Sequence, residues 1–148
     1  MPRNDERDFL VWALMGNKEA VAFLEQVFRV SQAWDDIIDG DKEVPRETVN
    51  KAFWEAITLP ENPFYARHFD KLQPVMQAAM TDWMAANQLE RGDAHDRNIA
   101  FVIRDNLASV VTQCAHLVGG FDWAQEIAPA IRRHTHEESL EQYKEGLP

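Results

Sequence analysis

The chain has 148 residues, which is the size of one domain with room for a substantial core. It is 45% hydrophobic and 27% charged, as is ordinary for a soluble globular protein. A formal net charge of −10 argues against general binding of nucleic acid, for which a basic face is expected.

Cysteine usage and the start of the chain predict where the protein works. The single Cys114 offers no disulfide framework and fits a reducing compartment. Residues 1–8 are highly charged, and no apolar run long enough to span a membrane follows them. We therefore expect a cytoplasmic protein with neither a signal peptide nor a membrane span.

The sequence pattern predicts helices throughout residues 1–148, arranged as a single all-α domain. Gly and Pro fall almost entirely at breaks, and no segment alternates long enough to form a convincing strand. In chain order, the predicted helices cover residues 5–15, 18–39, 46–58, 64–89, 94–118 and 122–134, with a short terminal piece at 137–144. The predicted architecture is therefore one bundle of about six helices.

Single residues mark several of these boundaries. Asn17 is predicted to cap the second helix, and Gly40 to end it. Pro74 is expected to kink or split the fourth helix. The pair Gly119-Gly120 is expected to close the fifth helix.

Four carboxylates crowd the predicted C-terminal end of the second helix, within residues 35–41. The helix dipole is negative at this end, so each carboxylate costs about 0.3–1 kcal/mol there. Residues 31–34 carry no cation. Asp35 and Asp39 are four positions apart and Asp36 and Asp39 three apart, so the three share a helix face. Because carboxylates are preferred Mg²⁺ ligands, the cluster predicts a magnesium site.

A second polar pattern lies in the predicted fifth helix. Asp105, Ser109 and Gln113 advance by four positions each, so on one helix they would form a single stripe. All three offer oxygen ligands. Apolar residues surround them in the sequence, and a polar stripe beside a core needs hydrogen-bonding or metal partners.

The two patterns together resemble the class I isoprenoid (terpenoid) synthase superfamily, which comprises prenyl diphosphate synthases and terpene cyclases. These enzymes are all-α bundles in which an Asp-Asp-x-x-Asp motif faces a second metal motif on another helix. The first motif matches Asp35, Asp36 and Asp39. The second matches Asp105, Leu107 and Ser109. Gln113 stands where the family usually has Glu, and Asn106 where it usually has Asp.

This resemblance implies an isoprenoid-synthase-like fold, strongly shortened, and a transferase or lyase that binds an isoprenoid diphosphate. The implied Mg²⁺ ligands are Asp35, Asp36, Asp39, Asp105, Ser109 and Gln113. The implied diphosphate-binding cations are Arg67, Arg104, Arg132 and Arg133. The metal would act as a Lewis acid on the leaving group. The expected partners are a small-molecule diphosphate and a second copy of the chain in a homodimer.

Other interpretations stay open on the sequence alone. The acidic cluster also fits a solvated helix end, and the second pattern fits ordinary hydrogen bonding between helices. His68, His95 and Asp96 loosely resemble the ligands of helical metal-dependent phosphohydrolases. A third alternative is a non-catalytic helical interaction protein, which should show an exposed apolar patch.

Overall fold

The structure is a computed structural model that describes residues 5–148, and every regular element within that range is helical. Among these described residues six α-helices are eight residues or longer, so the predicted all-α fold with about six helices is confirmed. The elements are α1 (Glu6–Ala13), α2 (Lys18–Asp39), α3 (Arg46–Thr58), the 3-10 helix η1 (Leu59–Glu61), α4 (Pro63–Arg67), α5 (Phe69–Leu89), α6 (Ala94–Ile103), α7 (Leu107–Thr135) and α8 (Leu140–Glu145). The likeness to isoprenoid synthases stays a prediction.

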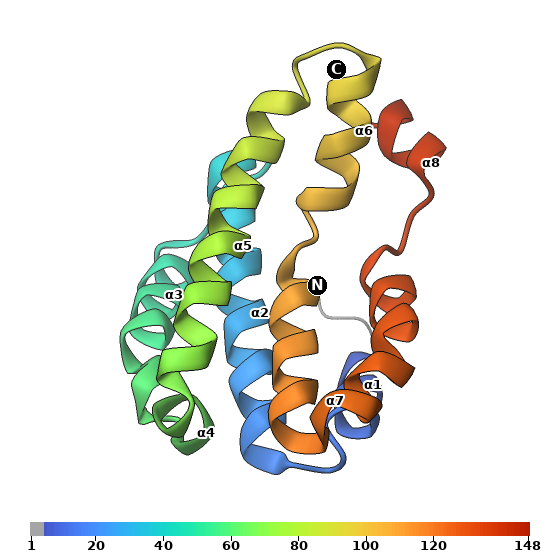
Figure 1. Ribbon diagram of the computed structural model, residues 1–148. Coiled ribbons are helices and arrows are strands. Elements are labelled where there is room, and N and C mark those ends of the chain that lie inside the picture. The colour runs from blue at the N-terminus through green and yellow to red at the C-terminus, as the bar shows by residue number, and fades with distance from the viewer. Residues whose placement is uncertain (1–4) are drawn as a thin grey trace. The chain divides into compact units, whose positions relative to one another are not determined.

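The chain divides into two compact units, of which the first ends at Phe69 and the second begins at Asp70. In the first unit α2 is the central helix, and α1, α3 and α4 all pack against it (Figure 1). The Phe23 ring on α2 stacks on Tyr65 with 5.1 Å between ring centroids, and Phe64 lies 6.3 Å away. These three aromatic rings form a core between α2 and α4. The prediction of a single domain stays a prediction.

Local capping signals set the ends of α2 where the sequence predicted them. The Asn17 side-chain oxygen accepts a hydrogen bond of 3.0 Å from the Ala20 backbone N–H. At the other end Gly40 takes the left-handed conformation with φ of 64°. Its N–H donates to the Asp36 carbonyl at 3.3 Å, which satisfies one of the carbonyls left over at the helix end.

In the second unit a small apolar core joins the end of α5 to α6 and α8. Ala86, Ala100 and Tyr143 are buried at its centre, one from each helix. Partly buried apolar side chains pack around them, namely Leu89, Phe101, Ile103 and Leu147. The short α8 is thereby tied to the longer helices of its unit.

The predicted fifth helix over residues 94–118 is wrong, because α6 ends at Ile103 and α7 begins at Leu107. The intervening Arg104, Asp105 and Asn106 side chains all contact residues far away in the sequence. Asn and Asp side chains also compete with helical hydrogen bonding, which lowers the cost of a break at this point.

Two further breaks involve a proline and a glycine. The predicted fourth helix is split, but at His68 between α4 and α5, while Pro74 lies inside α5 without ending it. Gly120 has φ of 83° and makes a kink within α7, which confirms the break expected at Gly119-Gly120. A left-handed backbone is cheap only for glycine.

Candidate functional site

The first predicted ligand set lies in the last turns of α2. Asp35 and Asp36 are half-buried there, and Asp39 is exposed. One Asp36 oxygen is 3.4 Å from the Lys42 ammonium nitrogen, and the other accepts a hydrogen bond of 3.0 Å from Gln32. The cation therefore comes from the turn after the helix and not from residues 31–34 before its end.

The second predicted ligand set does not form a stripe on one helix, because Asp105 lies in the break before α7. Its carboxylate is 3.3 Å from Nδ1 of His136. The Ser109 hydroxyl donates to Asn106 at 2.7 Å. The Gln113 amide donates to the backbone carbonyl of Lys71 at 3.4 Å. The three side chains thus have three different partners, and their role as metal ligands stays a prediction.

No group of three or more His, Cys, Asp or Glu side chains within residues 5–148 is arranged to hold a metal ion. The Asp35, Asp36 and Asp39 set belongs to the first unit, and the set that begins at Asp105 belongs to the second. The Mg²⁺ site of the isoprenoid synthase resemblance therefore stays a prediction.

The four arginines predicted to bind diphosphate are in different surroundings. Arg67 at the end of α4 and Arg133 on α7 are exposed. Arg104 pairs with Glu90, and Arg132 donates to the Asn106 side-chain oxygen at 3.1 Å. Arg67 belongs to the first unit and the other three to the second.

The residues of the phosphohydrolase alternative are also divided between the units. The His68 ring follows α4 in the first unit and lies 4.7 Å from the Phe64 ring. His95 and Asp96 lie in the first turn of α6 in the second unit. His95 is exposed. This alternative likewise stays a prediction.

A polar network that the sequence did not predict surrounds Glu90 at the end of α5. The Glu90 carboxylate accepts from the Arg104 guanidinium and from the Tyr143 hydroxyl, the latter at 2.5 Å. The guanidinium also lies over the Tyr143 ring, 5.9 Å from its centroid. Burial, together with Glu90, raises the pKa of Tyr143 above its usual value. We call these three residues the Glu90 network, and through Tyr143 it joins the small core of the second unit.

The structure reveals a feature of a different kind on α3: the helix has no buried residue. Val49, Phe53 and Ile57 follow one another at four-residue spacing, so they line one side of the helix. Their exposed fractions are 39%, 68% and 60%, and Trp54 beside them is 68% exposed. We call Val49, Phe53 and Ile57 the α3 stripe.

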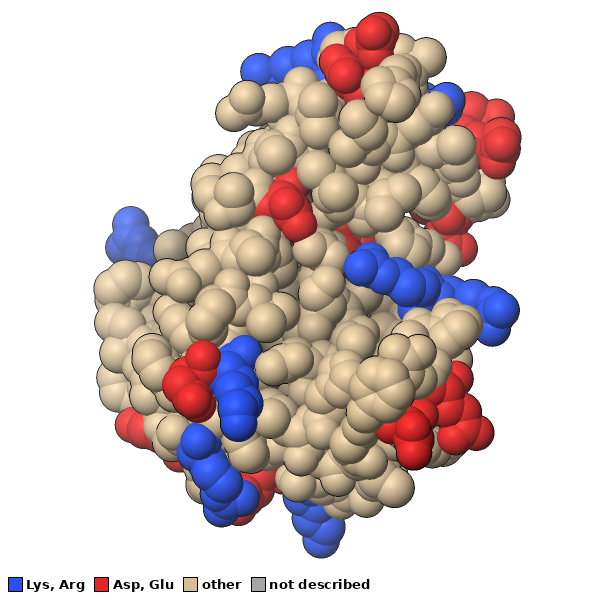
Figure 2. All heavy atoms as spheres, viewed as in Figure 1, with Lys and Arg blue, Asp and Glu red and all other residues tan. Residues whose placement is uncertain are grey.

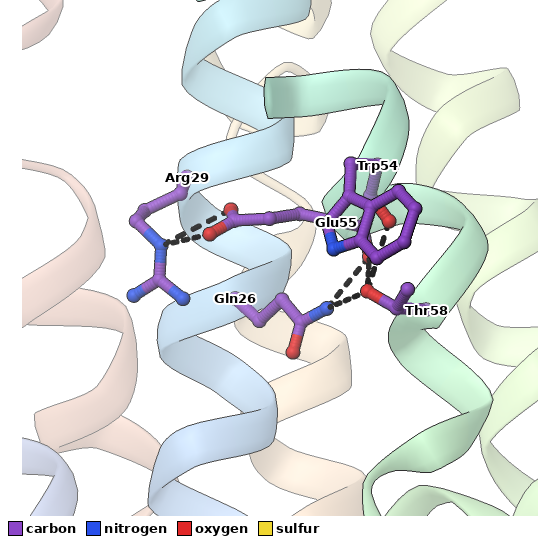
Figure 3. A network of polar contacts seen from close by, with 5 residues as sticks. All are labelled: Gln26, Arg29, Trp54, Glu55 and Thr58. Atoms are coloured by element: carbon purple, nitrogen blue, oxygen red, sulfur yellow. Dashed lines mark hydrogen bonds and ion pairs between the residues drawn. The ribbon is translucent and has the colours of Figure 1, made fainter. Parts of the chain in front are cut away.

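Polar contacts to α2 determine which side of α3 faces outward (Figure 3). Both Glu55 oxygens lie 3.1 Å from Nε of Arg29. The Gln26 amide donates to the Glu55 carbonyl at 2.6 Å and lies 3.5 Å from the Thr58 hydroxyl. The Thr58 hydroxyl in turn donates to the Trp54 carbonyl at 2.8 Å.

The helical period explains why these contacts leave the α3 stripe outside. Successive residues are about 100° apart around a helix, so Glu55 lies about 160° from Phe53, nearly opposite it. With Glu55 held against α2, Phe53 points away from that helix. The four-residue apolar spacing was visible in the sequence, but it also fits a helix that buries this side, so the pattern alone could not reveal the exposure.

Two further properties concern the helices as possible membrane spans and the distribution of surface charge. In the part of the chain that the structure describes, none of the helices combines the length and apolar character that a membrane crossing requires. On the face drawn in Figure 2, the charged side chains of described residues are scattered in small groups of both signs, with uncharged surface between them.

Comparisons of the chain with protein-family models, with curated proteins and with solved structures found no match.

Proposed function

We propose that this chain is a non-catalytic helical interaction module that binds a partner protein through the α3 stripe. The observation that carries the proposal is the exposure of Phe53, Ile57 and Trp54, each at least 60% accessible on one helix. Exposed apolar side chains gathered at helical spacing mark interaction surfaces more often than single ones do.

The polar attachment of α3 gives the proposal a physical basis. The α3 stripe is apolar surface that stays exposed to water. Each Å² of it that a partner removes from water contributes about 25 cal/mol to the free energy of binding. Because Glu55 and Thr58 already hold the opposite side against α2, the helix can present this face without first having to fold. Preorganised surfaces lose less entropy on binding.

The test is binding of a fluorescently labelled amphipathic helical peptide with an apolar stripe and no net charge, followed by anisotropy. The double change Phe53→Ser/Ile57→Ser should weaken binding at least about tenfold, because truncating the central apolar anchors of an interface costs about 2 kcal/mol or more. The matched control is Met80→Ser/Met84→Ser, another exposed pair at four-residue spacing, on α5. It should leave the affinity unchanged.

Two outcomes would overturn the proposal. The first is an absence of binding by the wild-type chain, or equal losses in both double variants. The second is a clearly lower melting temperature for Phe53→Ser/Ile57→Ser without any peptide. That result would mean that the chain's own packing uses the stripe.

The isoprenoid synthase hypothesis has a separate test. A ligand that binds only the folded state raises the apparent stability by mass action. If the chain retains a synthase-like site, Mg²⁺ with inorganic diphosphate should raise the melting temperature, and Asp35→Asn/Asp39→Asn should abolish the rise. Under the proposed function, Mg²⁺ and diphosphate should leave the melting temperature of both proteins unchanged.

A further inference from the structure

A groove between α1 and α2 lies in the first unit and does not involve the α3 stripe. Its volume is about 380 Å³, which is within the usual range for sites that hold small molecules. Side chains of both helices line it. They are Arg7 and Val11 on α1, and Lys18, Val21, Ala22 and Glu25 on α2.

A tight turn between the two helices places them side by side (Figure 1). Met15 and Gly16 both take the left-handed conformation, with φ of 54° and 74°. The Gly16 N–H donates to the Val11 carbonyl at 2.8 Å, which ends α1, and Gly16 itself lines the groove. Because these contacts are local, the groove forms together with the helix pair and is ready for a ligand.

The middle of the groove is apolar. Val21 of α2 is only 5% exposed, whereas Val11 of α1 is 44% exposed. Ala22, one position after Val21, is exposed as well. A ligand with an apolar body would remove the accessible surface of Val11 and Ala22 from water, which favours binding.

The two ends of the groove differ in charge. At one end Arg7 and Glu25 neutralise each other through hydrogen bonds of 3.1 and 2.8 Å. At the other end Lys18 is exposed, and no carboxylate within residues 5–148 pairs with it. The exposed carboxylates of Asp8 and Glu19 do not line the groove. Lys18 is also the first residue of α2, where the helix dipole favours an anion.

We infer that this groove binds a small amphiphilic carboxylate, such as a medium-chain fatty acid, with its alkyl chain over Val11 and Val21 and its carboxylate at Lys18. Lys18 and Glu25 are separated by about 10 Å along α2, so the chain can lie along the groove and end beside the neutral pair of Arg7 and Glu25. The opposite orientation would bring the ligand carboxylate toward Glu25, which would repel it.

The experiment compares octanoate, octanol and octylammonium, which share one alkyl chain and differ in the charge of the head group. NMR titration of the isotope-labelled full chain follows the methyl signals of Val11, Val21 and Ala22. Octanoate should shift these signals and bind at least about threefold more tightly than octanol, as expected for one exposed ion pair, and octylammonium should bind most weakly. Equal affinities for the three ligands, or shifts confined to other residues, would overturn the inference.

Two variants with matched controls locate the site. Lys18→Gln should abolish the preference for octanoate over octanol, while Lys51→Gln, which removes an exposed cation of α3, should keep it. Ala22→Leu fills part of the groove and should weaken octanoate binding at least about fourfold, the effect of excluding one methylene group. Ala66→Leu, at an exposed position of α4, should leave the affinity unchanged. Equal effects in a variant and its control would overturn the assignment.

The α3 stripe provides the remaining control, because the inference does not depend on the proposed function. Phe53→Ser/Ile57→Ser should leave octanoate binding unchanged even if it abolishes peptide binding. A loss of octanoate binding in this variant, with none in Ala22→Leu, would mean that the ligand binds the α3 stripe and that the groove is not its site.

Discussion

The two units use a carboxylate–arginine pair for opposite purposes. In the first unit Glu55 holds Arg29 at the surface, where the arginine side chain is 48% exposed. In the second unit the Glu90 and Arg104 side chains are both about one-fifth exposed, and Tyr143 joins them. The first pair attaches a helix whose apolar side stays outside, while the second closes a core. Similar ion pairs can therefore either hold a helix so that its apolar side stays exposed or help to close a buried core.

The largest expected effect comes from two phenylalanines of the first unit. Phe23 is fully buried on α2, whereas Phe53 on α3 is 68% exposed. Phe23→Ala should lower the free energy of unfolding by about 3–5 kcal/mol, because it removes core contacts and leaves a cavity. Phe53→Ala should change it by less than about 0.5 kcal/mol. Urea denaturation followed by circular dichroism measures both, and similar losses would show that the α3 stripe contributes to the fold.

The two ion pairs provide the next comparison. Glu90→Gln leaves the guanidinium of Arg104 without its carboxylate in a mostly buried place and weakens the acceptor for Tyr143. We expect a loss of about 2 kcal/mol in the free energy of unfolding. Glu55→Gln leaves Arg29 to be solvated by water, so its loss should stay below about 1 kcal/mol. Thermal and urea unfolding of the two variants under identical conditions gives the ranking, and the reverse order would contradict our account of the second unit.

The sequence predicted the helices best where local residues determine them. Asn17 and Gly40 bound α2 as expected, and α3 covers the predicted residues 46–58. Each signal acts within about one turn: a side-chain oxygen accepts a nearby N–H, and a glycine takes a left-handed conformation. Such interactions do not depend on the rest of the fold, so a sequence pattern can reveal them.

The α6–α7 break and the exposed side of α3 depend on contacts between distant residues. α6 ends just before Arg104, which meets Glu90 fourteen positions away, and Asn106 meets Asp82 twenty-four positions away. Likewise, the contacts that Arg29 and Gln26 of α2 make with Glu55 and Thr58 determine which side of α3 faces outward. Helical periodicity shows that a face exists but not what covers it, so the candidate site became visible only in the structure.

A third prediction tests whether helix capping contributes equally to the free energy of unfolding in the two units. Asn17 caps α2 in the first unit, and Asp93 caps α6 in the second by accepting from the Asp96 N–H at 2.9 Å. Asn17→Ala and Asp93→Ala should each lower the free energy of unfolding by about 1 kcal/mol. Chemical denaturation of both variants checks this, and a difference of more than about 1 kcal/mol would show that capping, and not only tertiary contacts, distinguishes the units.

The smallest expected effect is a pH dependence at the α6–α7 break. Burial raises the pKa of Asp105, although His136 and Arg104 nearby lower it and Glu138 raises it further. The folded chain therefore holds this proton more tightly than the unfolded chain does. The wild type consequently gains stability from Asp105 as the pH falls through the raised pKa toward the usual value of about 4. Asp105→Asn cannot gain in this way.

The free energy of unfolding of Asp105→Asn relative to wild type should therefore be highest near neutral pH and decline as the pH falls. The change should stay below about 1 kcal/mol, because the Asp105 side chain is still 38% exposed. Urea titrations at several pH values measure it, with Glu138→Gln as a control that keeps the titrating carboxyl. A relative stability that rises as the pH falls would mean that His136 controls this carboxyl more strongly than burial does. The break would then be held by an ion pair, as α3 is in the first unit.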